Sequence, residues 1–194
     1  MAVTALVTEL GKIAERVQEQ ATNEACPWRG EPILDETSQG KTLDELRANA
    51  SQMRRALIDA ARTLPDAAFE AQAPDADGRP VWSAGEVITH CNGVLTRFAD
   101  RAADMAGVDP PGWTAAQLAT GEQRLLDREA AIAAVEAVDP SAWLAAIPAD
   151  ADLESAVDHP AFGKMSARAW LHFMAVHEAN HVEQLEELRA EPSS

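Results

Sequence analysis

Several features are scarce in this 194-residue sequence, and each scarcity excludes a class of protein. Basic residues are the first: 16 Lys and Arg stand against 32 Asp and Glu, giving a formal net charge of −16. Nucleic-acid phosphates are bound by clustered Lys and Arg, so we expect no nucleic-acid partner. No apolar run approaches the roughly 18 residues that span a bilayer, so we expect no membrane partner.

Cysteine is also scarce, and the N-terminal residues do not show the pattern of a signal peptide. The two cysteines, Cys26 and Cys91, are too few for a disulfide framework, and charged residues from Glu9 to Arg16 interrupt any apolar N-terminal run. We therefore expect a cytoplasmic protein. Apolar residues make up 46% of the chain, which is enough for one compact domain with its own core.

Helical signals dominate what is present. Apolar side chains recur every three or four residues, and capping boxes at Thr42, Ser83 and Thr114 mark helix starts. Helices are predicted over 3–23, 42–64, 83–105, 114–138 and 166–189, with a short one around Trp143 and Leu144. Proline and glycine separate them, and 148–164 is predicted to be a loop. No useful stretch alternates with a period of two, so no strand is predicted.

The predicted fold is therefore all-α. Residues 42–190 form a four-helix bundle, residues 1–41 form an N-terminal helix and loop that make an arm on the bundle, and residues 191–194 form a disordered tail. The arm helix has an apolar face, which has to be buried against something.

Two of the five histidines, His177 and His181, lie four residues apart on the last predicted helix. This spacing places both imidazoles on one face, where they can bind one metal ion. The segment also matches the H-E-x-x-H pattern of zinc proteases. Such a protease needs a third ligand downstream and a strand that aligns its substrate, and only 13 residues (194 − 181) follow His181. A third ligand has to come from another helix, and His90 is the candidate; the alternative is a neutral core histidine.

Neighbouring polar side chains have both functional and structural interpretations. Glu178 is a candidate general base, although it lies about 100° around the helix from His177 and can equally face solvent. Gln184 shares the face of His181, where it can hydrogen-bond a ligating histidine or another helix. Glu86 lies one turn before His90, and it either contacts the site or only completes a capping box.

The remaining candidates have mainly structural interpretations. Cys91 is expected in the core, whereas Cys26 is the more reactive thiol, with Arg29 as its one basic neighbour in sequence. His159 is expected to hold the loop before the last helix, and His172 to lie outside the ligand set.

Two separated motifs carry a family resemblance. The segment Trp82–His90 is W-S-A-G-E-V-I-T-H, and His159–Ser166 is H-P-A-F-G-K-M-S, followed by Trp170, Phe173, His177, His181 and Gln184. Together, in this order, they resemble the two signatures of the DinB-like superfamily of metal-binding four-helix bundles. The resemblance covers roughly residues 42–190 and leaves the first 40 residues unexplained.

The resemblance implies a metal site and a class of reaction. His90, His177 and His181 match the three metal-binding histidines of the family, which hold zinc or nickel. Three imidazoles with a fourth position for water or substrate are typical of catalytic sites. Characterised relatives use bacillithiol or mycothiol, which implies a thiol-dependent transferase or related metalloenzyme acting on a small molecule, with Glu178 or a metal-bound hydroxide handling protons. Relatives often pair through bundle faces, which implies a homodimer.

Two alternatives stay open at this point. The protein can be a non-catalytic, stress-associated metal-binding protein, or a metal-dependent hydrolase that uses a bound hydroxide and needs no thiol. An open coordination position facing a cavity would favour an enzyme, whereas a fourth protein ligand would favour the non-catalytic alternative.

Overall fold

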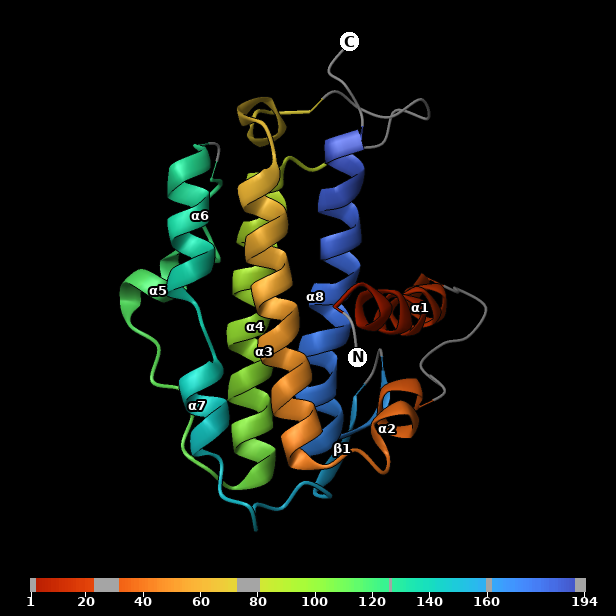
Figure 1. The fold of residues 1–194 in the computed structure, drawn as a ribbon. Coiled ribbons are helices and arrows are strands. Elements are labelled where there is room, and N and C mark those ends of the chain that lie inside the picture. The colour runs from red at the N-terminus through yellow and green to blue at the C-terminus, as the bar shows by residue number, and fades with distance from the viewer. Residues whose placement is uncertain (1–2, 23–31, 73–80, 126, 160–161, 191–194) are drawn as a thin grey trace.

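The structure is a computed structural model that describes residues 3–22, 32–72, 81–125, 127–159 and 162–190 (Figure 1). Three long helices run side by side: α3 (Leu43–Thr63), α4 (Ala84–Ala106) and α8 (Ala167–Ala190). α8 packs against both α3 and α4, and its buried face supplies much of the core. The predicted all-α bundle is confirmed.

Shorter helices occupy the fourth position of the bundle. They are α5 (Ala115–Ala119), α6 (Arg128–Ala137) and α7 (Ser141–Ala146), and α6 and α7 follow one another along the side of α3 and α4 (Figure 1). A 3-10 turn, η1 (Asp66–Phe69), follows α3. The prediction of one helix over 114–138 is therefore wrong, because the chain leaves the helical path between α5 and α6.

A close backbone contact accounts for this break. Gly121 lies against Gly93 of α4, and a Cβ added at Gly121 would come within 2.5 Å of the Gly93 Cα. The Thr89 hydroxyl also donates to the Gln123 carbonyl at 2.7 Å. Asp127 then begins α6 by accepting a hydrogen bond from the Ala130 N–H.

The loop predicted over 148–164 contains a short antiparallel hairpin instead. β1 (Ala156–His159) pairs with β2 (Gly163–Ser166) in a register that places Ala156 opposite Ser166 and His159 opposite Gly163. Each strand has four residues, which is too few for an alternating pattern to stand out in the sequence.

Two N-terminal helices cover one side of the bundle. α1 (Val3–Thr22) lies against α8 and runs across it, and α2 (Ile33–Ser38), which was not predicted, lies near the start of α8 (Figure 1). The apolar face of α1 is buried within the chain, with Leu6, Leu10 and Val17 each at most 5% exposed.

Local capping signals predicted the helix starts well. Thr42 and Ser83 form complete capping boxes with Glu45 and Glu86. The Ala169 N–H donates to the Ser166 hydroxyl at 3.1 Å, which caps α8 as predicted.

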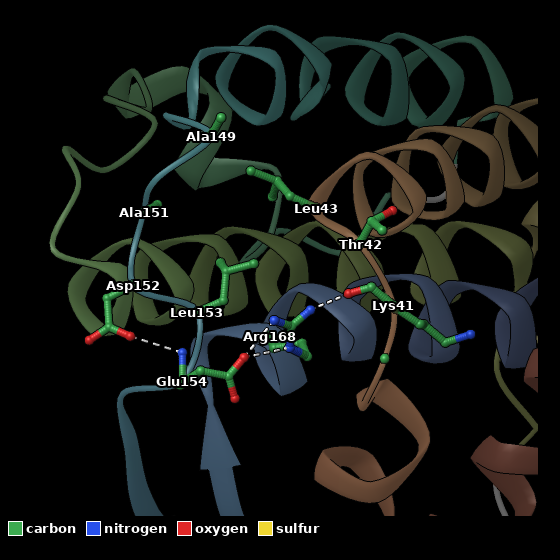
Figure 2. A pocket seen from close by; sticks show the side chains of 10 residues that line it. Lys41, Thr42, Leu43, Ala149, Ala151, Asp152, Leu153, Glu154 and Arg168 are labelled. Atoms are coloured by element: carbon green, nitrogen blue, oxygen red, sulfur yellow. Dashed lines mark hydrogen bonds and ion pairs between the residues drawn. The ribbon is translucent and has the colours of Figure 1, made fainter.

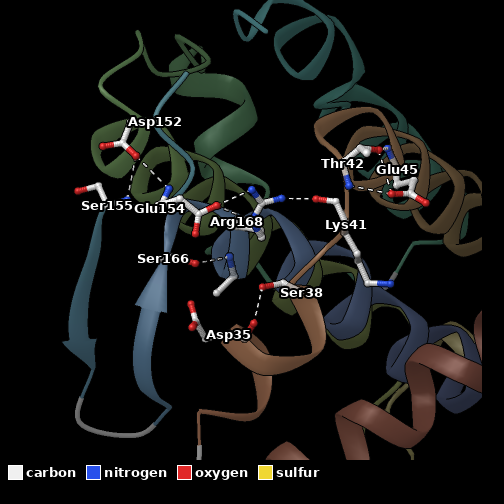
Figure 3. Close-up of polar contacts among 11 residues, drawn as sticks. Asp35, Ser38, Lys41, Thr42, Glu45, Asp152, Glu154, Ser155, Ser166 and Arg168 are labelled. Carbon is white, nitrogen blue, oxygen red and sulfur yellow. Dashed lines mark hydrogen bonds and ion pairs between the residues drawn. The ribbon is translucent and has the colours of Figure 1, made fainter. Parts of the chain in front are cut away.

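The first turn of α8 is tied to two distant segments by Arg168. Its guanidinium donates to the Glu154 carboxylate at 2.5 Å and to the Lys41 carbonyl (Figure 2). Asp152 accepts hydrogen bonds from the N–H groups of Glu154 and Ser155, which fixes the turn before β1 (Figure 3). A cavity of about 520 Å³ lies beside these contacts and is lined by none of the histidines.

Within the described ranges, no helix combines the length and apolar character that crossing a bilayer would require.

Candidate metal centre

Three histidine side chains converge where α4 faces α8. The Nε2 atoms of His90 and His177 lie 3.0 Å apart, and those of His177 and His181 lie 3.3 Å apart. All three ligand atoms fall within 4.8 Å of one another. Zinc–nitrogen bonds of about 2.0–2.1 Å in a tetrahedral site place the nitrogens about 3.3 Å apart, so this three-histidine cluster has the dimensions of a metal site.

The sequence explains how the cluster forms. His177 and His181 are one turn apart on α8, so their rings lie on one face. Ser83 fixes the start of α4, which puts His90 two turns into that helix and opposite them. Among the described residues, this is the one group of three or more His, Cys, Asp or Glu side chains that is close enough to hold an ion.

Burial favours the neutral form of all three imidazoles. Burial, with the nearby charges of His181 and Arg97, lowers the pKa of His90 to about 4. Burial also lowers the pKa of His177, well below its usual range, and that of His181. A neutral imidazole has a free lone pair, which is the form that binds a metal.

Gln184 orients one of these rings. Its Oε1 lies 2.8 Å from Nδ1 of His181 and accepts that hydrogen bond, because an amide oxygen has no proton to donate. Nδ1 therefore carries the proton, and the Nε2 lone pair of His181 faces the other two histidines.

Aromatic rings enclose the cluster on two sides. The Trp82 ring lies 5.0 Å from His90 and stacks over His181 at 6.4 Å. Phe98 and Phe173 pack edge to face on His177 at 5.7 and 6.1 Å. Phe98 was not among the predicted site residues, although it lies eight residues after His90, close to two helical turns.

Glu178 does not belong to this cluster. It is 1% exposed, and its carboxylate accepts a hydrogen bond from Arg54 on α3 at 2.7 Å. The same guanidinium donates to Asn92 Oδ1 at 2.6 Å and to the Val135 carbonyl at 2.8 Å. Burial raises the pKa of Glu178, and the charge of Arg54 opposes that rise. This carboxylate therefore connects α8 to α3 rather than facing the imidazoles.

The other candidates also lie outside the cluster. Glu86 accepts the Ser83 N–H at 2.8 Å and pairs with Arg124 at 2.9 Å. Cys91 is buried, which raises the pKa of its thiol well above the usual value. His159 stacks on Phe162 in the hairpin at 4.7 Å, and His172 is buried elsewhere on α8. Cys26 lies outside the described residues.

An open cleft of about 570 Å³ adjoins the cluster. His181 and Trp82 form one part of its wall, and α1 forms another through Glu15 and Gln18. The described chain thus offers three neutral nitrogen ligands, no fourth His, Cys, Asp or Glu ligand beside them, and adjoining space for a small molecule. This donor set suits a divalent ion such as zinc or nickel.

Comparison with known families gives one match. The sequence profile of the DinB superfamily matches residues 50–185, a segment that contains both histidine motifs. Neither the curated proteins nor the solved structures contain a match. Because the profile covers well over half of the chain and all three histidines, this chain belongs to the DinB superfamily.

Proposed function

We propose that this chain is a metal-dependent enzyme, in which His90, His177 and His181 hold zinc or nickel for a thiol-dependent transfer on a small molecule. The observation that carries the proposal is the convergence of three imidazole Nε2 atoms beside a cleft. A bound divalent ion would supply Lewis acidity, lowering the pKa of a thiol or water in its open position.

The chain's own residues would prepare that position. Gln184 fixes the tautomer of His181. Phe98 and Phe173 keep water from the side of His177 that they cover. Trp82, which is 38% exposed, offers a ring face at the mouth of the cleft. Glu178 is engaged by Arg54 and takes no part in proton transfer at the proposed metal site.

The first test is the metal content of the untagged full-length chain. Wild type, His90→Ala and His159→Ala would each be loaded with zinc or nickel, desalted and measured by mass spectrometry. We expect close to one ion per chain in wild type and in the His159→Ala control, and a sharp loss in His90→Ala. The control matters because a net charge of −16 collects cations nonspecifically. Equal, low metal in all three proteins would contradict the proposal.

Activity screens with and without low-molecular-weight thiols then define the reaction. Turnover that requires both the metal and a thiol supports the proposed transfer. Turnover that requires the metal alone would replace it with hydrolysis. Stoichiometric metal without turnover on any substrate class would instead indicate a metal-binding protein without catalysis.

A further inference from the structure

The cleft beside the three-histidine cluster has a second wall, part of which lies outside the family match. α8 contributes Glu183 and Glu187 to it, and α1, which precedes the matched residues 50–185, contributes Glu15. Its volume of about 570 Å³ lies within the roughly 300–1,000 Å³ of small-molecule sites. A substrate whose reacting group reaches the histidines would therefore place its remaining part between α1 and α8.

α1 approaches this part of α8 very closely. Gly11 lies directly against the Glu183 carboxylate, and a Cβ at Gly11 would come within 2.6 Å of its Oε2. Glu183 is partly buried beside this contact between α1 and α8.

The charged side chains that line the cleft are Glu15, Glu183 and Glu187, and no described Lys or Arg lines it. Within the described residues, none of these three carboxylates pairs with a cation, whereas four other carboxylates each pair with an arginine. Glu15 and Glu187 are exposed and Glu183 is partly buried, so the lining of the cleft carries an uncompensated negative charge that favours a cationic ligand. The cavity and the histidines identify the site, and the carboxylates determine the charge that it accepts.

The carboxylates of this cleft do not form a second metal site. Within the described chain, these carboxylates form no group with ligand atoms mutually within 4.8 Å, so they are too far apart to hold one ion together. Trp82 presents a partly exposed indole to the same cleft, and an aromatic face attracts alkylammonium groups.

We propose that this cleft binds the alkylammonium end of the substrate, while the reacting group of the substrate lies at the three-histidine cluster. The inference rests on the proposed function for the location of the reacting group. α1 then acts as the part of the chain that adapts a centre shared with the family to a positively charged substrate.

Choline and 3,3-dimethylbutan-1-ol form a matched pair of probes. The two molecules have the same shape, but a neutral carbon in the alcohol replaces the quaternary nitrogen of choline. Neither that carbon nor that nitrogen has a lone pair, so neither can bind a metal ion. Each would be titrated into the metal-loaded full chain and followed by calorimetry or by tryptophan fluorescence. We expect choline to bind on the order of tenfold more tightly than the alcohol.

Charge-neutralising variants show whether the carboxylates cause that preference. Glu15→Gln with Glu187→Gln should remove most of the choline preference and leave the alcohol unchanged. Glu9→Gln is the matched control, since it removes the same charge from an exposed position of α1 that does not line the cleft. Equal binding of the two probes to wild type, or a choline preference that survives in the double variant, would overturn the inference.

Metal content measured on the same samples separates the two proposals. Stoichiometric metal without a choline preference overturns the cleft inference and leaves the proposed function standing. A choline preference in protein that binds no metal supports the charge selectivity of the cleft and overturns the proposed function.

Discussion

His172 illustrates how single side chains in this core resist protonation. It is fully buried on α8, and neither ring nitrogen has a hydrogen-bond partner in the described chain. Burial, with a smaller contribution from the charge of Lys41, lowers its pKa to about 3. A histidine in an unfolded chain has a pKa of about 6.5. Below that pH, His172 therefore binds a proton in the unfolded chain and not in the folded chain, which favours unfolding.

Replacing His172 with an apolar residue of similar size should therefore change the pH dependence of stability. We expect His172→Leu to leave the free energy of unfolding at pH 7 unchanged or to raise it by about 1 kcal/mol, because two unpaired polar atoms leave the core. As the pH falls from about 6.5 towards 3, wild type should lose up to about 1.4 kcal/mol per pH unit more than the variant. Urea unfolding at several pH values measures this difference.

The other depressed histidines affect both proteins alike, so wild type and variant are compared in the same metal state. His159→Leu is the control, because His159 is only partly buried. Parallel pH profiles for wild type and His172→Leu would show that His172 takes up its proton in the folded chain.

At the scale of elements, the Arg54 guanidinium connects four helices. It starts from α3, pairs with Glu178 on α8, and donates to Asn92 on α4 and to the Val135 carbonyl on α6. Arg54 and Glu178 are each 1% exposed, so their charges have little contact with water. Breaking such a pair costs far more than breaking an exposed one, because it leaves a buried charge alone.

Removing Arg54 should destabilise the packing of all four helices against one another. We expect Arg54→Met to lower the free energy of unfolding by about 3–5 kcal/mol, and Arg54→Met with Glu178→Met to recover most of that loss. Arg62→Met, which breaks the exposed pair with Glu136, should cost less than about 1 kcal/mol. Denaturant unfolding of the four proteins provides the test, and equal losses in the single and double variants would contradict it.

Elements with local signals were predictable, and those set by tertiary contacts were not. The capping boxes that begin at Thr42 and Ser83 each span only four residues, and both are present in the structure. The break after α5 depends on Gly121 meeting Gly93, a contact between segments that are distant in sequence. The same limit applies to the site: helical spacing aligns His177 with His181, whereas the partner of Glu178 lies 124 residues away. His90 was a candidate third ligand from its place on another helix, and the family resemblance favoured that role over a neutral core histidine.

At the scale of the whole molecule, the three-histidine cluster joins the two helices that carry both family motifs. A ligand that binds the folded chain and not the unfolded one stabilises the fold by mass action. At a free metal concentration of 100 Kd, this effect is about 2.7 kcal/mol, which corresponds to roughly 5–10 °C in Tm for a domain of this size.

Stripping zinc or nickel with a chelator should lower the Tm of wild type by that amount. The Tm of His90→Ala should change much less, since two histidines on one helix bind more weakly than three. Scanning calorimetry measures both proteins, and magnesium is the control ion because oxygen-rich acidic surfaces bind it while imidazoles do not prefer it. An equal Tm shift with magnesium, or in His90→Ala, would place the ion on the acidic surface.

The arrangement of the cluster along the chain also makes it a sensor of local opening. The imidazoles of His177 and His181 are brought together by α8 alone, whereas His90 lies 87 residues before His177 and joins them only when α4 is docked. Bringing together residues so far apart in sequence carries an entropic cost, and the packing of the bundle offsets that cost. Any excursion that lifts α4 from α8 would leave a bound ion on two ligands. The rate of metal release to a chelator would then report how often these helices separate while the rest of the chain stays folded.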